Sequence, residues 1–418
     1  DWIDRYKDAR VWDLVWDIPE AELWETRRRR KRRLVTFVRE RVQQAAIARK
    51  ASASEIRRLG EVLDPDTFTI GFSRRFATYK RATLLFKDMA RLKKILTNPD
   101  MPVQIIFAGK AHPKDMPGKN FIREIWQMSR DPEISRRLVF VEDYSIQVGR
   151  ELVQGVDLWL NNPKRGEEAC GTSGMKAALN GVINLSVLDG WFDEAYEVSG
   201  GWAIGDREPY ADDQDDIHAS ATYSMLENEI IPMYYRDRDR GAPEEWMRRV
   251  KQCIANITPR FNCQRMIAEY DTELYQPAHN GFQSASQNRF QPIHEHRRWM
   301  ETVRAQWDRT RILEIGPKLD NPAVNGHSLT VRAVIDLGGL TPDDVRVEAV
   351  VGRIGVEGFL EDTTVVHLTP NGESNGATVF TREFMPGHTG RLGMSIRLMP
   401  NHSQDPLTRP CHPLMKWG

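Results

Sequence analysis

The amino-acid sequence predicts an α/β protein in which a domain built on a parallel sheet is followed by a small all-β domain. Between residues 64 and 202, short β-rich runs alternate with helical ones, which is typical of parallel strands joined by crossover helices. Beyond residue 313, apolar and polar residues alternate, with Gly, Pro and Asn between the runs, as in antiparallel strands. A chain of 418 residues has room for two or three domains.

The parallel sheet is predicted from five β-rich runs: Thr67–Phe72, Val103–Phe107, Leu138–Val141, Val156–Leu160 and Val182–Val187. Helical runs at Thr83–Leu96 and Ile122–Ser129 follow the first two strands, as crossover connections do. Ligands of such sheets bind beyond the C-terminal ends of the strands. The segments that follow the strands are therefore where we expect the chemistry.

The flanking segments complete the predicted organisation. Residues 1–63 form a helical lead-in, and its cation run, Arg27 to Arg33, is interpreted as the solvated face of an amphipathic helix. Residues 64–288 are assigned to the sheet domain with its helices, closing in a polar break at Gln276–Asn288. Residues 289–312 are predicted to be a linking helix and residues 313–418 a β-sandwich-like domain.

The composition excludes several classes of protein. Lys and Arg number 59 and so do Asp and Glu, which leaves no global charge to attract nucleic acid or anionic lipid. The four cysteines contain no C-x-x-C pair, which favours reduced thiols. No apolar run approaches the roughly 18 residues that span a bilayer, and no signal peptide opens the sequence. We expect a cytoplasmic protein that binds neither nucleic acid nor membrane.

Two segments indicate an anion site. The run EACGTSGMKAALNG at residues 168–181 places a Gly-rich loop ahead of a short helix, so its amides can cradle an anion, although a plain tight turn is the alternative. The run FSRRFATYKRA at residues 72–82 places four cations directly after the first strand, although a solvated helix start is the alternative. Together they predict one strongly anionic ligand site.

These segments resemble successive motifs of the bacterial, short-type α-glucan phosphorylases. The resemblance extends through FAGKAHP at 107–113, VEDY at 141–144, VLDGWFDE at 187–194, IIPMYY at 230–235 and PRF at 259–261. It implies the C-terminal Rossmann-like domain of a two-domain glycosyltransferase fold. It also implies phosphorolysis of α-1,4-glucan to α-glucose 1-phosphate, with α-glucan and inorganic phosphate as partners, pyridoxal 5'-phosphate as cofactor and a possible homo-oligomer.

The resemblance also implies roles for individual residues. Lys176 carries the cofactor as a Schiff base. Arg74 holds the cofactor phosphate, Arg75 the substrate phosphate, and Lys80 bridges both. The remaining expected contacts are Tyr144 near the pyridine ring, the amides of Gly171 and Thr172 toward phosphate, and Glu168, Cys170 and Gly171 toward the sugar.

The sequence departs from the larger animal and plant relatives at three of these positions. Those enzymes have lysine where Arg74 stands, a basic residue where Ser145 stands and serine where Cys170 stands. The first exchange keeps the charge. The second removes a cofactor contact, so no role is carried over to Ser145, and the third weakens a sugar contact.

Other candidate residues have plainer interpretations. His294 and His296 lack further ligands at zinc-like intervals, and we expect no metal site. The cluster Asp212, Asp213, Asp215 and Asp216 lacks the spacing of a calcium loop and is interpreted as a solvated loop. Trp191 and Trp202 suit either sugar stacking or core packing.

Two alternatives to a phosphorylase stay open at this point. A sugar-nucleotide glucan synthase shares the architecture without using pyridoxal phosphate, and a truncated or non-catalytic protein could bind glucan alone. The sequence begins with Asp, and only one series of alternating strands and helices is predicted, so we expect that a preceding domain is missing and that this chain alone does not phosphorolyse glucan.

Overall fold

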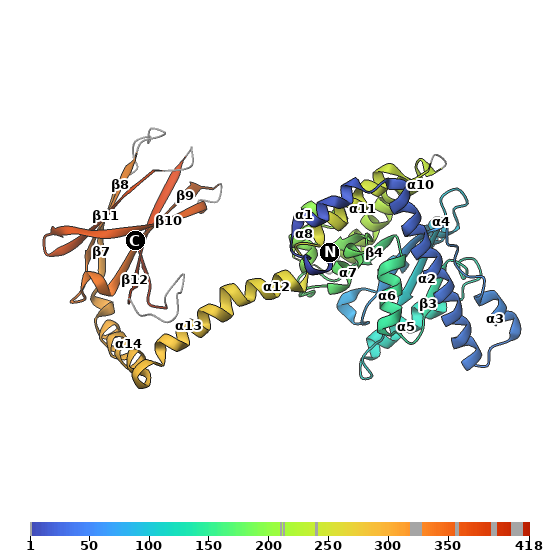
Figure 1. The fold of residues 1–418 in the computed structure, drawn as a ribbon, viewed down its shortest axis with the longest axis horizontal. Helices are drawn as coiled ribbons and strands as arrows, with labels where there is room; N and C mark the ends of the chain where they lie inside the picture. The colour runs from blue at the N-terminus through green and yellow to red at the C-terminus, as the bar shows by residue number, and fades with distance from the viewer. Residues whose placement is uncertain are drawn as a thin grey trace. The chain divides into compact units, whose positions relative to one another are not determined.

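The computed structural model describes residues 2–209, 211, 214–238, 241–317, 328–355, 359–385, 391–402 and 413–418. The chain divides into two compact units, Asp1–Ala268 and Glu269–Gly418 (Figure 1). The division falls near the C-terminal end of helix α12, Cys263–Tyr270, ahead of the boundary at residue 288 that the sequence suggests.

The first unit is built on a six-stranded parallel sheet of order β3-β2-β1-β4-β5-β6. Its strands are β1 Phe68–Ser73, β2 Val103–Ala108, β3 Leu138–Val141, β4 Leu158–Asn161, β5 Ile183–Val187 and β6 Trp202–Ile204. The five predicted strands are confirmed, and only the three-residue edge strand β6 was not predicted. Strand β1 pairs with both β2 and β4, so the strand order reverses there, which is the place where such sheets bind ligands.

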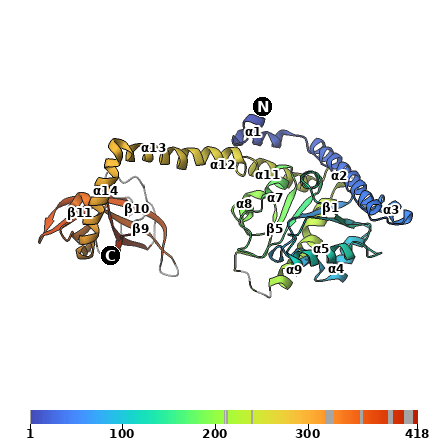
Figure 2. The same cartoon turned by 90° about the horizontal axis from the view of Figure 1, so that it is seen from below.

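Helices cover both faces of this sheet. Side chains of β1 alternate between the two faces, and its apolar ones, Phe68, Ile70 and Phe72, all join the core under α4, α5, α9, α10 and α11. The core of the other face lies under α2, α6 and α7. Figure 2 shows α2 on one side of the sheet and α4, α5 and α9 on the other.

The helices of the first unit are α1 Ala9–Asp13, α2 Glu20–Ala48, α3 Ala53–Leu59, α4 Met89–Thr97, α5 Met116–Met128, α6 Ile146–Gly155, α7 Thr172–Leu179, α8 Trp191–Ser199, α9 Gln214–Met225, α10 Ile231–Tyr235, α11 Glu244–Ile257 and α12. The predicted helix Thr83–Leu96 is divided into the 3-10 turn η4, Leu84–Phe86, and α4. The division occurs because Asp88 caps α4, its side chain accepting the Arg91 N–H.

The cation run of α2 is not the fully solvated face that the sequence predicted. Lys31 is buried, and its Nζ lies 2.5 Å from the Asp157 carboxylate and 3.1 Å from the Thr67 carbonyl oxygen. Arg27 is also buried and donates to the carbonyl oxygens of Gln154 and Asn180 at 2.9 and 2.8 Å. Burial lowers the pKa of both groups, because desolvation penalises the charged form. These two cations bind α2 to the sheet and α7.

The second unit contains a seven-stranded antiparallel sheet of order β13-β12-β9-β10-β11-β8-β7. Its strands are β7 Arg311–Gly316, β8 Leu329–Asp336, β9 Val345–Ile354, β10 Leu360–Ser374, β11 Ala377–Phe384, β12 Leu392–Pro400 and β13 Lys416–Trp417. The long strand β10 pairs first with β9 and then with β11, and apolar residues of these three strands belong to one core. Val303 and Trp307, near the end of α14, Gln287–Gln306, join that core.

The predicted polar break at Gln276–Asn288 is wrong for most of its length, because α13 occupies Gln276–Ala285. Its proline, Pro277, stands just after the π-helical turn Asp271–Tyr275, and the chain is helical on both sides of it. The helical geometry is interrupted only at Asn288, Arg289 and Phe290, which have φ of 47°, 60° and 64°. Polar composition alone therefore did not decide whether this segment is helical.

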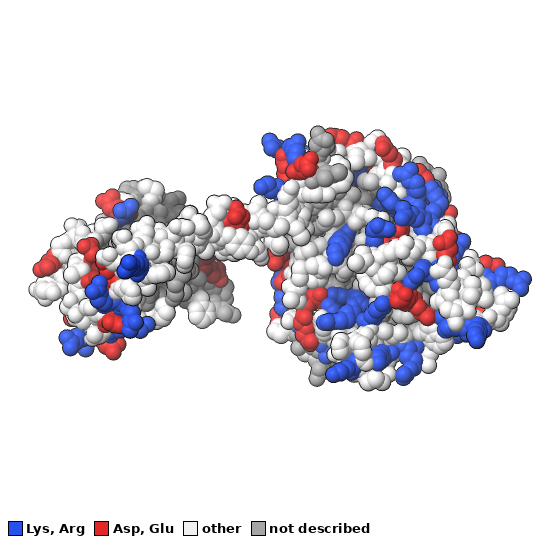
Figure 3. Space-filling model, turned by 60° about the horizontal axis from the view of Figure 1, so that its bottom comes forward, with Lys and Arg blue, Asp and Glu red and all other residues white. Residues whose placement is uncertain are grey.

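Charges of both signs cover the surface. On the face drawn in Figure 3, lysines and arginines gather in several groups with acidic side chains among them. Among the described residues, no helix is long and apolar enough to cross a membrane.

We predict that Lys31→Met lowers the free energy of unfolding by about 3–5 kcal/mol, because it leaves the buried Asp157 carboxylate without its cation. Arg32→Met is the matched control on the same helix. Its pair with Glu25 is solvent-exposed, so the loss should stay below about 1 kcal/mol. Urea denaturation followed by far-UV circular dichroism measures both, and equal effects of the two variants would contradict the structural role of Lys31.

Candidate functional site

The loop that follows β1 carries the predicted phosphate-binding cations. Arg74 begins it and Lys80 ends its 3-10 turn η3, Thr78–Lys80; both side chains are buried. The Arg74 N–H donates to the Ala108 carbonyl oxygen at 3.2 Å, which holds the exits of β1 and β2 together. Gly109 permits this approach, because a Cβ there would overlap the Arg74 carbonyl. The pairing of β1 with β2 thus fixes the backbone position of Arg74.

The loop that follows β4 brings Glu168 to these cations. The Glu168 carboxylate lies 2.5 Å from the Arg74 guanidinium and also forms an ion pair with Lys80, and all three side chains are buried. The two loops are joined along their backbones, since the Lys164 N–H donates to the Tyr79 carbonyl oxygen at 2.7 Å. Two cations on one carboxylate leave a net positive charge in a buried site, which favours a further anion.

The guanidinium of Arg74 is incompletely satisfied. Burial lowers its pKa, and the charge of Glu168 opposes that shift. Its Nη1 atom is buried without a hydrogen-bond partner among the described residues. A buried charged donor without an acceptor costs free energy, so this nitrogen marks a place where a ligand oxygen fits.

Arg75 differs from its neighbours. Its side chain is exposed, and in the part of the chain that the structure describes it has no ion-pair partner. The guanidinium of Arg75 lies next in the chain to the buried ion cluster and is accessible to an anion in solution.

The N-terminal end of α7 borders the same ion cluster. Its N-cap, Gly171, has φ 84°, and a Cβ there would lie 3.5 Å from the Glu168 carboxylate. No side chain of the described residues caps this end, so the first amides of α7, beginning with Thr172, point out of the helix without a capping acceptor. Lys176, in the second turn, is exposed. The Gly-rich segment is therefore a helix start beside the cations, as the anion-cradle hypothesis requires.

Tyr144 packs against the apolar core on the face of the sheet that α2, α6 and α7 cover, and its hydroxyl lies against Gly149 of α6. Ser145 caps α6, its hydroxyl accepting the Val148 N–H at 3.4 Å. Ser145 thus has a structural role at a position for which no ligand role was expected.

Cys170 lies between the ion cluster and an apolar core. It packs against the cluster containing Trp191, and its carbonyl oxygen accepts the Trp191 N–H at 3.0 Å. Burial raises the pKa of its thiol, and the charges of Glu168 and Glu194 raise it further. Trp191 and Trp202 are 3% and 5% exposed, so core packing accounts for both rings.

Sequence reasoning missed two residues that hold the site together. Arg81 donates to the carbonyl oxygens of Asn162 and Pro163 at 2.9 and 2.8 Å and pairs with Asp215, so Asp215 is not simply part of a solvated loop. The other residue is Asp189, whose carboxylate accepts backbone N–H groups of the β4 loop. Both lie inside segments that carry the family resemblance, which was the available signal. Asp212 and Asp213 lie outside the described residues.

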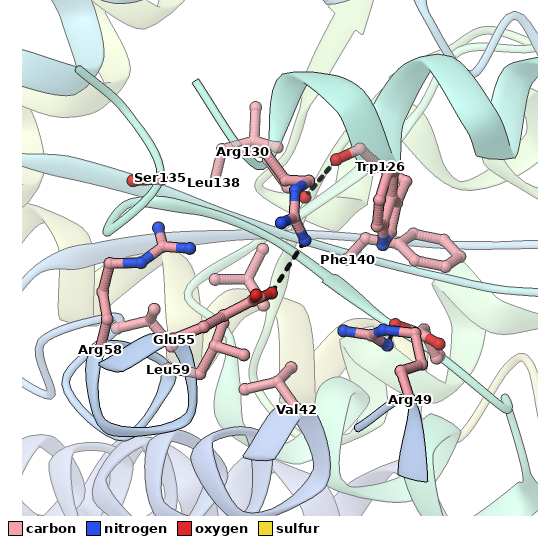
Figure 4. Close-up of a pocket in the computed structure, with 14 residues that line it drawn as sticks. Val42, Arg49, Glu55, Arg58, Leu59, Trp126, Arg130, Ser135, Leu138 and Phe140 are labelled. Atoms are coloured by element: carbon pink, nitrogen blue, oxygen red, sulfur yellow. Dashed lines mark hydrogen bonds and ion pairs between the residues drawn. The ribbon is translucent and has the colours of Figure 1, made fainter. Parts of the chain in front are cut away.

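A separate pocket lies at the β3 edge of the sheet (Figure 4). It has a cavity volume of about 40 Å³, and its lining includes Arg49, Arg58 and Arg130 beside Trp126 and Phe140. Arg130 pairs with Glu55 at 2.9 Å, and Arg49 pairs with Glu142. We assign it no ligand, because it holds about one water's worth of space and most of its charge is already paired.

Comparisons with known proteins decide the family. A family model described as carbohydrate phosphorylase matches residues 22–200, and one described as glycogen phosphorylase C-terminal domain matches residues 307–413. The chain belongs to the carbohydrate phosphorylase family. The first match contains every residue of the candidate site, from Arg74 to Asp189.

Individual relatives agree. The chain is 34% identical to a glycogen phosphorylase of Mycobacterium tuberculosis over 96% of its own length and 47% of the relative's. It is 37% identical to a maltodextrin phosphorylase of Thermococcus litoralis over 97% and 47% of the two lengths. It is 46% identical to a glycogen phosphorylase of Aquifex aeolicus over 65% and 39%. The chain thus spans about half the length, or less, of these relatives.

We predict an order of cysteine reactivity at pH 8. Cys263 is exposed and should be alkylated by iodoacetamide first; Cys170, whose pKa is raised, should follow, and Cys253, whose pKa burial raises to about 12, should react last. Because a raised pKa leaves less thiolate, the Cys170 rate should keep rising above pH 9. Peptide mass mapping measures each rate, and Cys170 reacting ahead of Cys263 would contradict this environment.

Proposed function

We propose that this chain forms the cofactor-binding part of a pyridoxal-phosphate-dependent α-glucan phosphorylase. Such an enzyme transfers a glucosyl unit from the end of an α-1,4-glucan to inorganic phosphate, with retention, and yields α-glucose 1-phosphate. The observation that supports this best is the ion cluster of Arg74, Lys80 and Glu168, with an unsatisfied guanidinium nitrogen, at the uncapped end of the helix that carries Lys176. The names of the relatives, glycogen phosphorylase and maltodextrin phosphorylase, support the same activity.

The residues present fit pyridoxal phosphate. The exposed amine of Lys176 is available for a Schiff base, and the amides at Gly171 and Thr172 offer donors to a phosphate. Tyr144 would pack near the pyridine ring. When bound, the cofactor supplies a phosphate group that exchanges a proton with the substrate phosphate. The chain's own task is to hold these two anions together.

That task sets an electrostatic requirement. Two unit charges of like sign about 5 Å apart repel by about 3 kcal/mol at an effective dielectric constant near 20, and dianions multiply this about fourfold. Arg74 and the α7 amides would bind the cofactor phosphate, Arg75 the substrate phosphate, and Lys80 both. Three cations from one loop would offset the repulsion between the cofactor phosphate and the substrate phosphate.

Glu168 has a second role in this proposal. Its carboxylate neutralises Arg74 and Lys80 in the structure, and these are the cations assigned to the phosphates. When phosphate oxygens take over the cations, the carboxylate becomes free to accept hydrogen bonds from glucosyl hydroxyls, next to Cys170 and Gly171. The same carboxylate would thus hold the two cations together before phosphate binds and recognise the sugar afterwards.

Further features stay proposals. The first unit suits the C-terminal Rossmann-like half of a two-domain glycosyltransferase fold, with the rest of the glucan groove supplied by another domain. A cytoplasmic location and homo-oligomerisation are expected for this activity.

We predict that Lys176 is the lysine that binds the cofactor. After incubation with pyridoxal phosphate and borohydride reduction, peptide mapping should find a pyridoxyl group on Lys176, and Lys176→Arg should abolish it together with imine absorbance between about 300 and 430 nm. Lys164→Arg is the control and should keep the adduct. An adduct on Lys80, Lys110 or Lys164 would show that the assignment is wrong.

We predict that Arg75→Ala weakens use of phosphate without loss of fold. In a preparation with phosphate-dependent turnover, kcat/KM for phosphate should fall about 10²–10³-fold, the scale of one lost electrostatic clamp. The midpoint of thermal unfolding should stay unchanged, because Arg75 is exposed. Arg57→Ala, on the exposed face of α3, is the control. Unchanged phosphate kinetics in the Arg75 variant would remove it from the site.

A further inference from the structure

The turn between β5 and α8 is hydrogen-bonded to the backbone of the loop that carries Glu168. One oxygen of the Asp189 carboxylate accepts the N–H groups of Gly166 and Glu168, each at 2.9 Å, and the other accepts the N–H of Gly190 at 2.9 Å. Hydrogen bonds to an ionised acceptor are about twice as strong as neutral ones. Asp189 therefore fixes the loop on the N-terminal side of the Glu168 side chain.

The next two residues hold the other side of the same loop. Gly190 has φ 54° and ψ −135°, and a Cβ there would overlap the Cys170 carbonyl oxygen and lie 2.8 Å from that of Glu168. This permits Trp191 to donate its N–H to the Cys170 carbonyl oxygen at 3.0 Å. The turn thus contacts the backbone before and after Glu168, which fixes the position from which its side chain reaches Arg74 and Lys80.

We propose that Asp189 is a positioning residue for the phosphate-binding cations, acting through the backbone of Glu168. This rests on the proposed function, in which Arg74 and Lys80 bind phosphate groups. Asp189 does not touch the ligand. It fixes the backbone position of the 166–170 loop. The Glu168 carboxylate can then contact both Arg74 and Lys80 and hold them where phosphate binds.

The chemistry of the carboxylate explains why asparagine cannot replace it. All three partners of Asp189 are N–H donors, and an amide offers one accepting oxygen and one donating nitrogen. In Asp189→Asn, at least one backbone donor therefore faces an NH₂ group. The loop should shift, and Glu168 should lose its alignment with Arg74.

The test compares pyridoxal phosphate with pyridoxal, which forms the same imine but carries no phosphate. In the full 418-residue chain, Asp189→Asn should raise the dissociation constant for pyridoxal phosphate about tenfold, the scale of one unsatisfied buried donor, as measured by titrating imine absorbance. Imine formation with pyridoxal should stay unchanged, because it does not use the cations. A purely structural defect would weaken both ligands equally, and that result would overturn the proposal.

Asp66→Asn is the matched control. It removes the same charge at the opposite end of β1, where the exposed Asp66 pairs with Arg28 at 2.7 Å, and it should leave both ligands unaffected. If Asp189→Asn does not fold, Asp189→Glu keeps the charge while displacing the oxygens, and the same selective loss for pyridoxal phosphate is expected. Wild-type chain that forms no imine with either ligand contradicts the proposed function itself; a normal wild type with an unaltered Asp189 variant contradicts only the role of Asp189.

Discussion

The carboxylate of Glu168 holds two buried cations side by side, and the candidate site depends on this one group. At about 4 Å, two cations repel by about 4 kcal/mol at an effective dielectric constant near 20, so Arg74 and Lys80 could not share a buried space without an anion between them. In the structure Glu168 is that anion. In the proposed function, phosphate oxygens take over these cations, and the Nη1 atom of Arg74 has no hydrogen-bond partner among the described residues.

The geometry of this cluster follows from the strand order of the sheet. Since β1 has β2 on one side and β4 on the other, the loop with Arg74 and the loop with Glu168 leave the sheet from adjacent strands. A backbone hydrogen bond from Lys164 to Tyr79, and side-chain hydrogen bonds from Arg81 to the carbonyls after β4, then join the two loops. The β5 to α8 turn supports them through Asp189. Three successive strand ends thus contribute to one site.

Strand β4 also connects the site to the rest of the first unit. Asp157, just before its start, pairs with the buried Lys31 of α2, while the loop after its end presents Glu168. The strand is therefore anchored by charge at both ends. Anchoring the start of β4 restricts sliding of the strand, and a small displacement of Glu168 would separate it from one of its two cations.

The sequence by itself determined the parallel strands, the order of the motifs and the residue types of the candidate anion site. Alternation of apolar runs fixes strands locally, and the FSRRFATYKRA and EACGTSGMKAALNG segments contain their cations, glycines and lysine in a fixed order. Only the tertiary structure decided which of the cations are buried. Arg27 and Lys31 were predicted to be solvated because helical periodicity cannot show that Asp157, far along the chain, lies opposite them. The contacts of Glu168 and Asp189 could not be predicted for the same reason. The partners of a carboxylate depend on strand order and on backbone amides from other loops, and local residue patterns contain neither.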